Sequence, residues 1–303
     1  MLYTCRSVEC ADARQPLVLL AKSGKRTSRS PRAAAAAKLV GKRKDGSLRV
    51  DLHCHYLNPA VKTLIAPLNP AEHIPAVRFA NPLTHFSHKI ASGEPITIVA
   101  MGSSSTAGAG ASSDAATYPS RLAVELKQLF PGHDITVVNR GVSGEEVPDM
   151  LKRFDTAIVA AKPDLVLWQL GTNSVIRDRR VDNNVPRIVE GLLKIRSTGA
   201  DVVLIDPQYA PKVIAKPEAA RMVELIAMTA KQESIDLFPR FDVMKRWHDI
   251  DHMGFEAFVA PDGLHMNDWS YACLAHALGQ AIAEAAQRPV LSATVSPHLM
   301  PAD

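Results

Sequence analysis

From about residue 95 to residue 285, short apolar runs alternate with longer stretches of helical periodicity. Five of the runs are rich in Val, Ile and Leu, a composition typical of buried strands. They are Ile96–Met101, Ile135–Asn139, Leu165–Leu170, Val202–Ile205 and Ile235–Phe238. Strands that alternate with helices are joined by right-handed crossovers, which produce a parallel sheet covered by helices on both faces. The sequence therefore predicts an α/β fold with a mostly parallel, five-stranded sheet.

The stretches between these runs carry the spacing of amphipathic helices. Helices are expected over Tyr118–Leu129, Val147–Ala160, Val185–Arg196, Pro217–Gln232 and Trp269–Ala285. In the first of them Leu122, Leu126 and Leu129 recur at helical spacing, and Thr117 precedes it as a capping residue. Because an open parallel sheet binds its ligands at the carboxyl ends of the strands, the loops after the strands are where site residues are expected.

The net charge of +4 is unevenly distributed along the chain. Residues 1–50 contain 12 Lys and Arg against 3 Asp and Glu, whereas the rest of the chain is mildly acidic. A basic segment with few aromatic residues predicts a poorly ordered, solvated extension, which we favour over an arm that binds nucleic acid. We therefore expect an extension over residues 1–90, a folded domain over residues 91–288 and a tail over residues 289–303, with no nucleic-acid partner.

The chain carries no recognisable membrane or export signal. The apolar run within residues 15–21 is too short to span a membrane, and the basic sequence after it does not resemble a cleavage site. We expect no transmembrane segment. The compartment stays open between the cytoplasm, taken by default, and export.

Three serines and a threonine directly follow the first predicted strand. The strand stops at Gly102, and Ser104 then lies at the carboxyl end of the strand, where a nucleophile can be placed beside a helix N-terminus. Serines here also cap helices, so the segment alone leaves both roles open. A phosphate-binding loop would need a lysine, and none occurs between Gly102 and Arg121. The G-x-S-x-G elbow fails because Thr106 replaces its second glycine.

Three later segments place small or polar residues after predicted strands. Gly141 follows the second strand, where a backbone N–H can closely approach a ligand. Asn173 follows the third, where a side-chain amide can donate to a developing oxyanion. Asp262 and His265 stand three residues apart, so the carboxylate can orient the imidazole while the other ring nitrogen faces a nucleophile. Each residue alone also fits a turn or surface role, but their order along the chain is distinctive.

This order of Ser, Gly, Asn and Asp-x-x-His resembles the SGNH hydrolases, the GDSL-type esterase and lipase superfamily, over about residues 95–285. The resemblance implies a three-layer α/β/α, flavodoxin-like fold. It implies Ser104 as the nucleophile with His265 and Asp262 as its partners. It also implies an oxyanion hole formed by Ser104, Gly141 and Asn173.

Two positions depart from the family pattern. Ser103 stands where the family usually has an aspartate before the nucleophile. Ser174 stands where an aspartate commonly follows the family's asparagine, which is Asn173 here. Neither position is a primary catalytic group in the family. We therefore expect altered tuning of the site and not loss of activity.

A second resemblance lies in the N-terminal extension. The sequence from Val50 to Pro59 resembles the first strand of amidohydrolase-type metal enzymes, in which two histidines bind zinc. Alternation places His53 and His55 on the same side of such a strand. The resemblance covers only about residues 30–88, too few to supply the further ligands. We expect a fragment without a functional metal site, and adventitious metal would bind through His53 and His55.

The predicted activity is hydrolysis of carboxylic esters through an acyl-enzyme on Ser104. The expected substrates are small-molecule or carbohydrate esters with short acyl chains, including O-acetyl groups, and no cofactor is needed. Two alternatives stay open: O-acyl transfer at the same site, and a catalytically silent binding protein on the same fold.

Overall fold

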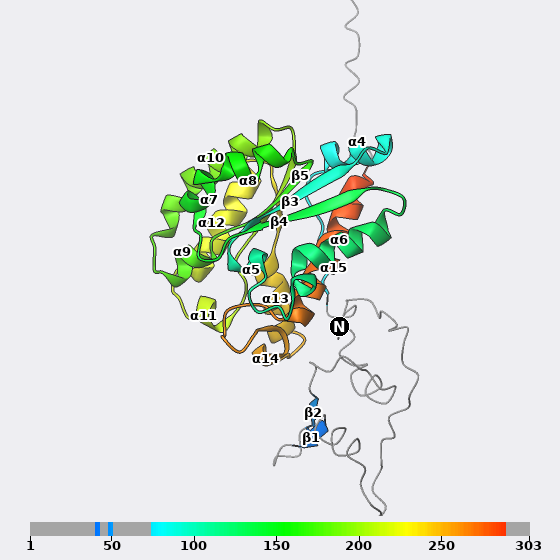
Figure 1. Ribbon diagram of the computed structural model, residues 1–303. Helices are drawn as coiled ribbons and strands as arrows, with labels where there is room; N and C mark the ends of the chain where they lie inside the picture. Colours follow the sequence, from blue (N-terminus) through cyan, green and yellow to red (C-terminus); the bar gives the residue numbers. More distant parts are fainter. Residues whose placement is uncertain (1–39, 43–47, 51–73, 289–303) are drawn as a thin grey trace, which may run out of the picture.

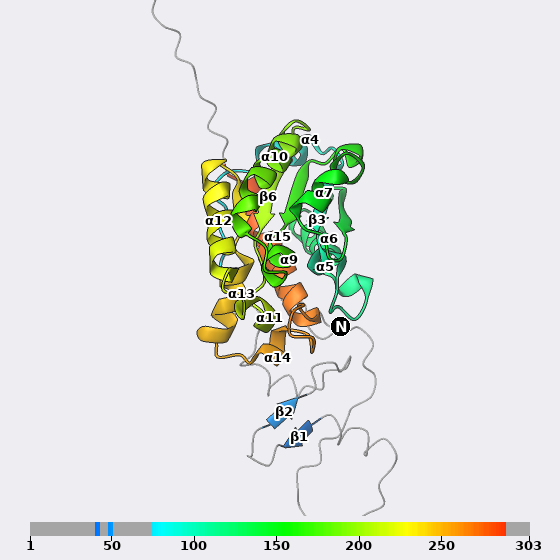
Figure 2. The same cartoon turned by 90° about the vertical axis from the view of Figure 1, so that its left-hand side faces the viewer.

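The computed structural model describes residues 74–288 and two short strands ahead of them, β1 (Val40–Lys42) and β2 (Leu48–Val50), which pair antiparallel. In the described domain a single sheet lies between two groups of helices (Figure 1). Helices α6 and α15 pack against each other on one side, and α7, α10 and α12 lie on the other (Figures 1 and 2). This arrangement confirms the predicted three-layer α/β/α fold.

The sheet has five parallel strands in the order β4-β3-β5-β6-β7. The strands are β3 (Ile96–Gly102), β4 (Ile135–Gly141), β5 (Leu165–Gln169), β6 (Asp201–Ile205) and β7 (Asp236–Phe238). All five occur where the sequence predicts them, and the order is that of a flavodoxin-like, doubly wound sheet. The chain runs from β3 outward to β4 and then returns to the other side of β3. The resulting switch point lies between β3 and β5, where such sheets bind their ligands.

The helices vary widely in length. Those of eight residues or more are α4 (Thr84–Ser92), α6 (Tyr118–Leu129), α10 (Asn184–Arg196), α12 (Ala219–Gln232), α13 (Arg240–Asp249) and α15 (Asp268–Ala286). The shorter ones are α5 (Ser104–Ala107), α7 (Val147–Lys152), α8 (Phe154–Ala157), α9 (Thr172–Ile176), α11 (Pro211–Ile214) and α14 (Phe255–Phe258). The single helix predicted over Val147–Ala160 is divided into α7 and α8 at Arg153, whose φ of −111° and ψ of 11° are not helical. None of the described helices is long and apolar enough to cross a membrane.

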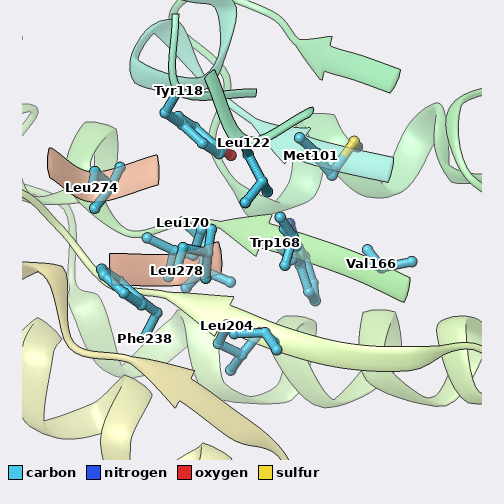
Figure 3. Close-up of a cluster of buried hydrophobic side chains, with 14 of the residues drawn as sticks. Met101, Tyr118, Leu122, Val166, Trp168, Leu170, Leu204, Phe238, Leu274 and Leu278 are labelled. Carbon is cyan, nitrogen blue, oxygen red and sulfur yellow. The ribbon is translucent and has the colours of Figure 1, made fainter. Parts of the chain in front are cut away.

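The core is built around the central strand β5. All five of its residues are buried, as expected for a parallel strand covered on both faces. Trp168 is fully buried (Figure 3), and its ring packs edge-on against Phe154 while Nε1 donates to Met150 Sδ at 3.2 Å. A Cβ at Gly191 would lie 2.3 Å from this ring, so α10 can approach the sheet only because residue 191 has no side chain. Truncating a buried aromatic ring of this kind typically costs about 3–5 kcal/mol.

The packed domain includes residues before residue 91, where the sequence predicts that the domain begins. Phe79, Leu83 and Phe86 are buried in the core. The Phe86 N–H donates to the Asp201 carboxylate at 2.9 Å. Asp201, the first residue of β6, thereby caps the start of α4. The sequence does not predict α4, because many prolines in this stretch argue against a helix. The helix nevertheless fits between Pro82 and Gly93, the glycine at its C-terminus.

Candidate active site

The loop after β3 is held tightly beneath Ser104. A Cβ at Gly102 would lie 2.2 Å from Thr106 Oγ1 and 2.8 Å from Gln169 Oε1, so this turn requires a residue without a side chain. Gln169 Oε1 accepts the backbone N–H of Ser103 at 3.0 Å and its hydroxyl at 3.1 Å. These bonds end the strand and start α5 within two residues, which places the half-buried Ser104 in the first turn of α5.

The loop before α15 orients an imidazole through one carboxylate. Asp262 Oδ1 accepts the backbone N–H groups of Leu264 and His265 at 2.9 and 3.0 Å, and Oδ2 binds His265 Nδ1 at 2.5 Å. The other ring nitrogen, Nε2, lies 2.8 Å from Ser104 Oγ. Ser104 therefore forms one hydrogen-bonded series with His265 and Asp262, which lie in a loop far from it in the sequence.

The protonation of this series follows from its contacts. Partial burial raises the pKa of Asp262. Hydrogen bonds from the His265 ring and from the N–H groups of His265 and Leu264 outweigh that effect and hold the pKa below its usual value. The carboxylate is therefore charged at neutral pH. With Nδ1–H donating to Asp262, the neutral imidazole has Nε2 free to accept the proton of Ser104 Oγ.

The segment after α5 fastens the serine loop to the histidine loop. A Cβ at Gly110, which has a φ of +88°, would lie 2.3 Å from the carbonyl oxygen of Met266. The Tyr271 hydroxyl donates to the carbonyl of Ala109 at 2.7 Å, and the Ser112 N–H donates to Asp268 Oδ1 at 2.7 Å. Helix α15 thus holds both loops, which explains how the side chains of Ser104 and His265 stay within hydrogen-bonding distance.

Asn173 lies at the start of α9, at the carboxyl end of β5. Its side chain is buried, and Nδ2 donates to the carbonyl of Glu145 at 2.8 Å. An amide nitrogen carries two hydrogens, so one remains for a ligand. The neighbouring Ser174 donates its hydroxyl to Glu146 Oε2 at 3.0 Å, which shows what this departure from the family pattern contacts.

Gly141 has a different role from the one the sequence suggests. Its N–H donates to Asn139 Oδ1 at 2.9 Å, so in this arrangement the N–H does not face a ligand. A Cβ at residue 141 would lie 2.1 Å from the backbone nitrogen of Ala107. Gly141 is therefore needed for the close packing of β4 against α5, and Asn139 strengthens that contact by donating Nδ2 to the Thr106 carbonyl at 2.9 Å.

Gly144 presents a backbone N–H in the same loop. Its φ is +82°, and within the described part of the chain this N–H has no hydrogen-bond partner. The same holds for the N–H of Ser104 at the start of α5. Gly144 lies next to Glu145, whose carbonyl binds Asn173. Among the described residues, the loops after β3, β4 and β5 therefore each carry one hydrogen-bond donor that has no partner: the N–H of Ser104, the N–H of Gly144 and one amide hydrogen of Asn173.

Sequence reasoning missed two supporting groups. Gln169 is fully buried and holds the serine loop; the available signal was a single polar residue at the end of an otherwise apolar strand. Arg153 and Glu145 form an ion pair at 2.6 Å, which joins the end of α7 to the loop after β4. No local pattern marks that pair.

The possible metal ligands of the N-terminal extension, His53 and His55, lie outside the described residues. Among the residues that the structure does describe, no group of three or more His, Cys, Asp or Glu side chains could hold a metal ion.

Comparisons with known proteins identify the family of this chain. Residues 71–288 match the Non-GDSL lipase-like family. An acetylxylan esterase of Geobacillus stearothermophilus is 34% identical over 168 residues, which are 50% of this chain and 74% of that enzyme. An arylesterase of Vibrio mimicus is 26% identical over 153 residues, 49% of this chain and 70% of the relative.

Solved structures show the same fold. A two-domain esterase active on acetylated mannans superposes with a TM-score of 0.58 at 16% identity. The superposition covers 76% of this chain and 60% of that one, so this chain spans less than two thirds of the two-domain enzyme. At this identity the likeness concerns the fold alone.

Proposed function

This chain belongs to the non-GDSL lipase-like family and is an SGNH/GDSL-type hydrolase that acts on ester bonds; from that premise we propose that it is a serine esterase working through an acyl-enzyme. One observation carries the proposal. Ser104 Oγ lies 2.8 Å from His265 Nε2, and His265 Nδ1 lies 2.5 Å from Asp262 Oδ2. This is the arrangement that a hydroxyl needs to become a nucleophile at neutral pH.

In the proposed reaction His265 Nε2 takes the proton of Ser104 as Oγ attacks the ester carbonyl carbon. Asp262 stays ionised and stabilises the imidazolium that forms. Collapse of the tetrahedral intermediate breaks the bond to the alcohol, and His265 gives its proton to the leaving alkoxide. Water then repeats the sequence on the acyl-serine, releasing the carboxylic acid and restoring the Ser104 hydroxyl.

The oxyanion would be held by the N–H of Ser104, the N–H of Gly144 and the remaining amide hydrogen of Asn173. The predicted donor Gly141 is replaced by Gly144, because the Gly141 N–H is bound to Asn139. In the proposal these three donors act on the negative charge that develops on the carbonyl oxygen during the reaction. Removing one donor of this kind typically lowers kcat about 100- to 1,000-fold.

For the substrate we propose esters with short acyl chains, including O-acetyl groups on carbohydrates. The support is the 34% identity to the acetylxylan esterase over half of this chain. Acyl transfer to a sugar hydroxyl uses the same first step, with the hydroxyl in place of water.

The test is a panel of p-nitrophenyl esters from acetate to decanoate together with acetylated xylo-oligosaccharide. Wild type is compared with Ser104→Ala and with Ser105→Ala. Ser105 is the matched control, because its hydroxyl is buried one residue away and makes no hydrogen bond within the described chain. Ser104→Ala should lower turnover by at least about a thousandfold and abolish labelling by a fluorophosphonate, while Ser105→Ala keeps both.

Three results would change the proposal. Wild-type rates in Ser104→Ala would remove the nucleophile assignment. A wild-type protein that reacts with neither ester nor fluorophosphonate would be a silent binding protein. Transesterified product in the presence of a sugar acceptor would make it an acyltransferase.

A further inference from the structure

The Arg153 side chain makes several hydrogen bonds near the proposed oxyanion site, yet it contacts none of the reacting groups. Its Nε lies 2.7 and 2.9 Å from the two carboxylate oxygens of Glu145, and Nη2 lies 2.6 Å from one of them. Nη2 also donates to the carbonyl of Arg140 at 2.8 Å. Only 21% of the Arg153 side chain and 13% of the Glu145 side chain are exposed, so water screens the pair weakly.

Glu145 connects this ion pair to the oxyanion donors. Its carboxylate binds Arg153, its own carbonyl accepts Asn173 Nδ2 at 2.8 Å, and its peptide joins it to Gly144. Within the loop itself, the bond from the Glu145 N–H to the Val142 carbonyl is long, at 3.4 Å. The conformation of residues 142–145 is therefore fixed largely from outside the loop.

Arg153 also ties that loop to the strands beneath it. The guanidinium reaches the last residues of β4 through the Arg140 carbonyl and approaches the Gly102 carbonyl of β3 at 3.5 Å. One planar side chain thus spans the ends of two strands and the loop above them. A bidentate guanidinium does this with little freedom of movement, unlike a lysine ammonium.

We propose that Arg153 is a positioning residue that presets the oxyanion donors through Glu145. This inference rests on the proposed serine esterase function. Its physical basis is that the donors must already face the site of the developing charge when Ser104 attacks, and a displacement near 1 Å can cost about 100-fold in rate. Arg153 also stands at the break between α7 and α8, where its backbone leaves helical geometry.

The chain provides a matched control at the other end of the sheet. Arg288 Nε lies 3.0 and 3.1 Å from the carboxylate oxygens of Glu284, and Nη2 donates to the Phe79 carbonyl at 2.6 Å. Like Arg153, Arg288 binds one carboxylate through Nε and Nη2 and also donates to two backbone carbonyls, here those of Phe79 and Ala80. It contacts none of the proposed catalytic loops.

The experiment compares full-length wild type with Arg153→Gln, Arg153→Lys, Glu145→Gln and Arg288→Gln. For each variant we would measure kcat and KM with p-nitrophenyl acetate and the rate of fluorophosphonate labelling. We would also measure inhibition by a methyl trifluoromethyl ketone, an analogue of an acetyl ester, and the melting temperature. The ketone forms an oxyanion on the nucleophile and so reports on the donors without turnover.

We expect Arg153→Gln and Glu145→Gln to lower kcat by about 10- to 100-fold, with KM changed by less than about threefold. Binding of the ketone should weaken by a similar factor, and Arg153→Lys should recover part of the loss. Arg288→Gln should keep kcat and ketone binding within about twofold, whatever its effect on the melting temperature.

The inference is overturned if Arg153→Gln behaves like Arg288→Gln in kcat and in ketone binding, or if it changes KM alone. These results differ from failure of the proposed function, which Ser104→Ala reports independently. A wild-type chain in which Ser104 reacts with neither ester, ketone nor fluorophosphonate would overturn both proposals.

Discussion

The two ends of the sheet contain the same kinds of side chain but use them differently. At the carboxyl end, Asp262 binds His265, and the second nitrogen of that ring faces Ser104. At the amino end, His85 Nε2 lies 2.8 Å from Asp164 Oδ1, while Oδ2 of the same carboxylate accepts the Thr97 N–H at 2.8 Å. A close His–Asp pair is therefore not sufficient to identify a catalytic site.

The difference lies in the hydrogen-bonding capacity that each end leaves unused. At the amino end the strand-start carboxylates bind fixed backbone groups: Asp201 accepts the Phe86 N–H and Asp236 accepts the Asn81 N–H, both at 2.9 Å. At the carboxyl end, the N–H groups of Ser104 and Gly144 have no partner within the described residues. The carboxylates of the amino end hold residues 81–86 to the sheet. The carboxyl end leaves these two donors available, as the proposed binding of a transient charge requires.

The largest expected effect separates the two histidines. His265→Ala should lower kcat for p-nitrophenyl acetate by about a thousandfold or more, because Ser104 loses its base. His85→Ala should leave kcat within about twofold, because His85 contacts no proposed catalytic residue. Steady-state kinetics on both variants would decide this, and equal losses would show that the contrast between the two ends is wrong.

The next test exchanges the two carboxylates for amides. Asp262→Asn should lower kcat about 10,000-fold, because an amide no longer favours the productive tautomer of His265, and it should change stability little. Asp164→Asn should do the reverse and reduce the free energy of unfolding by about 1–3 kcal/mol, since a buried acceptor of the Thr97 N–H is altered. Urea unfolding and kinetics on each variant measure both quantities. A loss of activity without a loss of stability in Asp164→Asn would contradict the assignment.

The smallest effect concerns a third acid, Asp206, which follows β6. Burial raises its pKa to about 7, although the Phe241 N–H and the charge of Arg240 act in the opposite direction. The folded protein therefore binds this proton more tightly than the unfolded chain, in which aspartates have a pKa of about 4. The resulting stabilisation is complete below about pH 4 and is lost as the pH rises through about 7.

Asp206→Asn should remove this dependence. Relative to the variant, wild type should lose stability between pH 5 and pH 8, as measured by urea unfolding at both values. The comparison with Asp262 is instructive, because contacts with His265 and two backbone N–H groups lower the pKa of that acid instead. An identical pH slope in wild type and variant would show that Asp206 is ionised throughout this range.

Much of this molecule could be predicted from local pattern. The five strands are each marked by a short apolar run, and α6 begins and ends where its leucine spacing predicts. The helix α4 was not predicted, because its start is capped by Asp201 from a strand more than a hundred residues later. The family and the action on ester bonds were also predicted correctly, since the order of Ser, Gly, Asn and Asp-x-x-His can be read from the sequence. The individual catalytic roles stay predictions.

The sequence by itself determined the alternation of strands and helices, the polar loops after the strands and the identity of the groups that they carry. Only the tertiary structure decided which of those groups meet. It joined residues 104 and 265 at 2.8 Å, directed the Gly141 N–H to Asn139, and placed Arg153 against Glu145. The physical reason is that periodicity and propensity act over one or two turns of chain. A hydrogen bond between distant loops depends on the position of every strand and helix that lies between them.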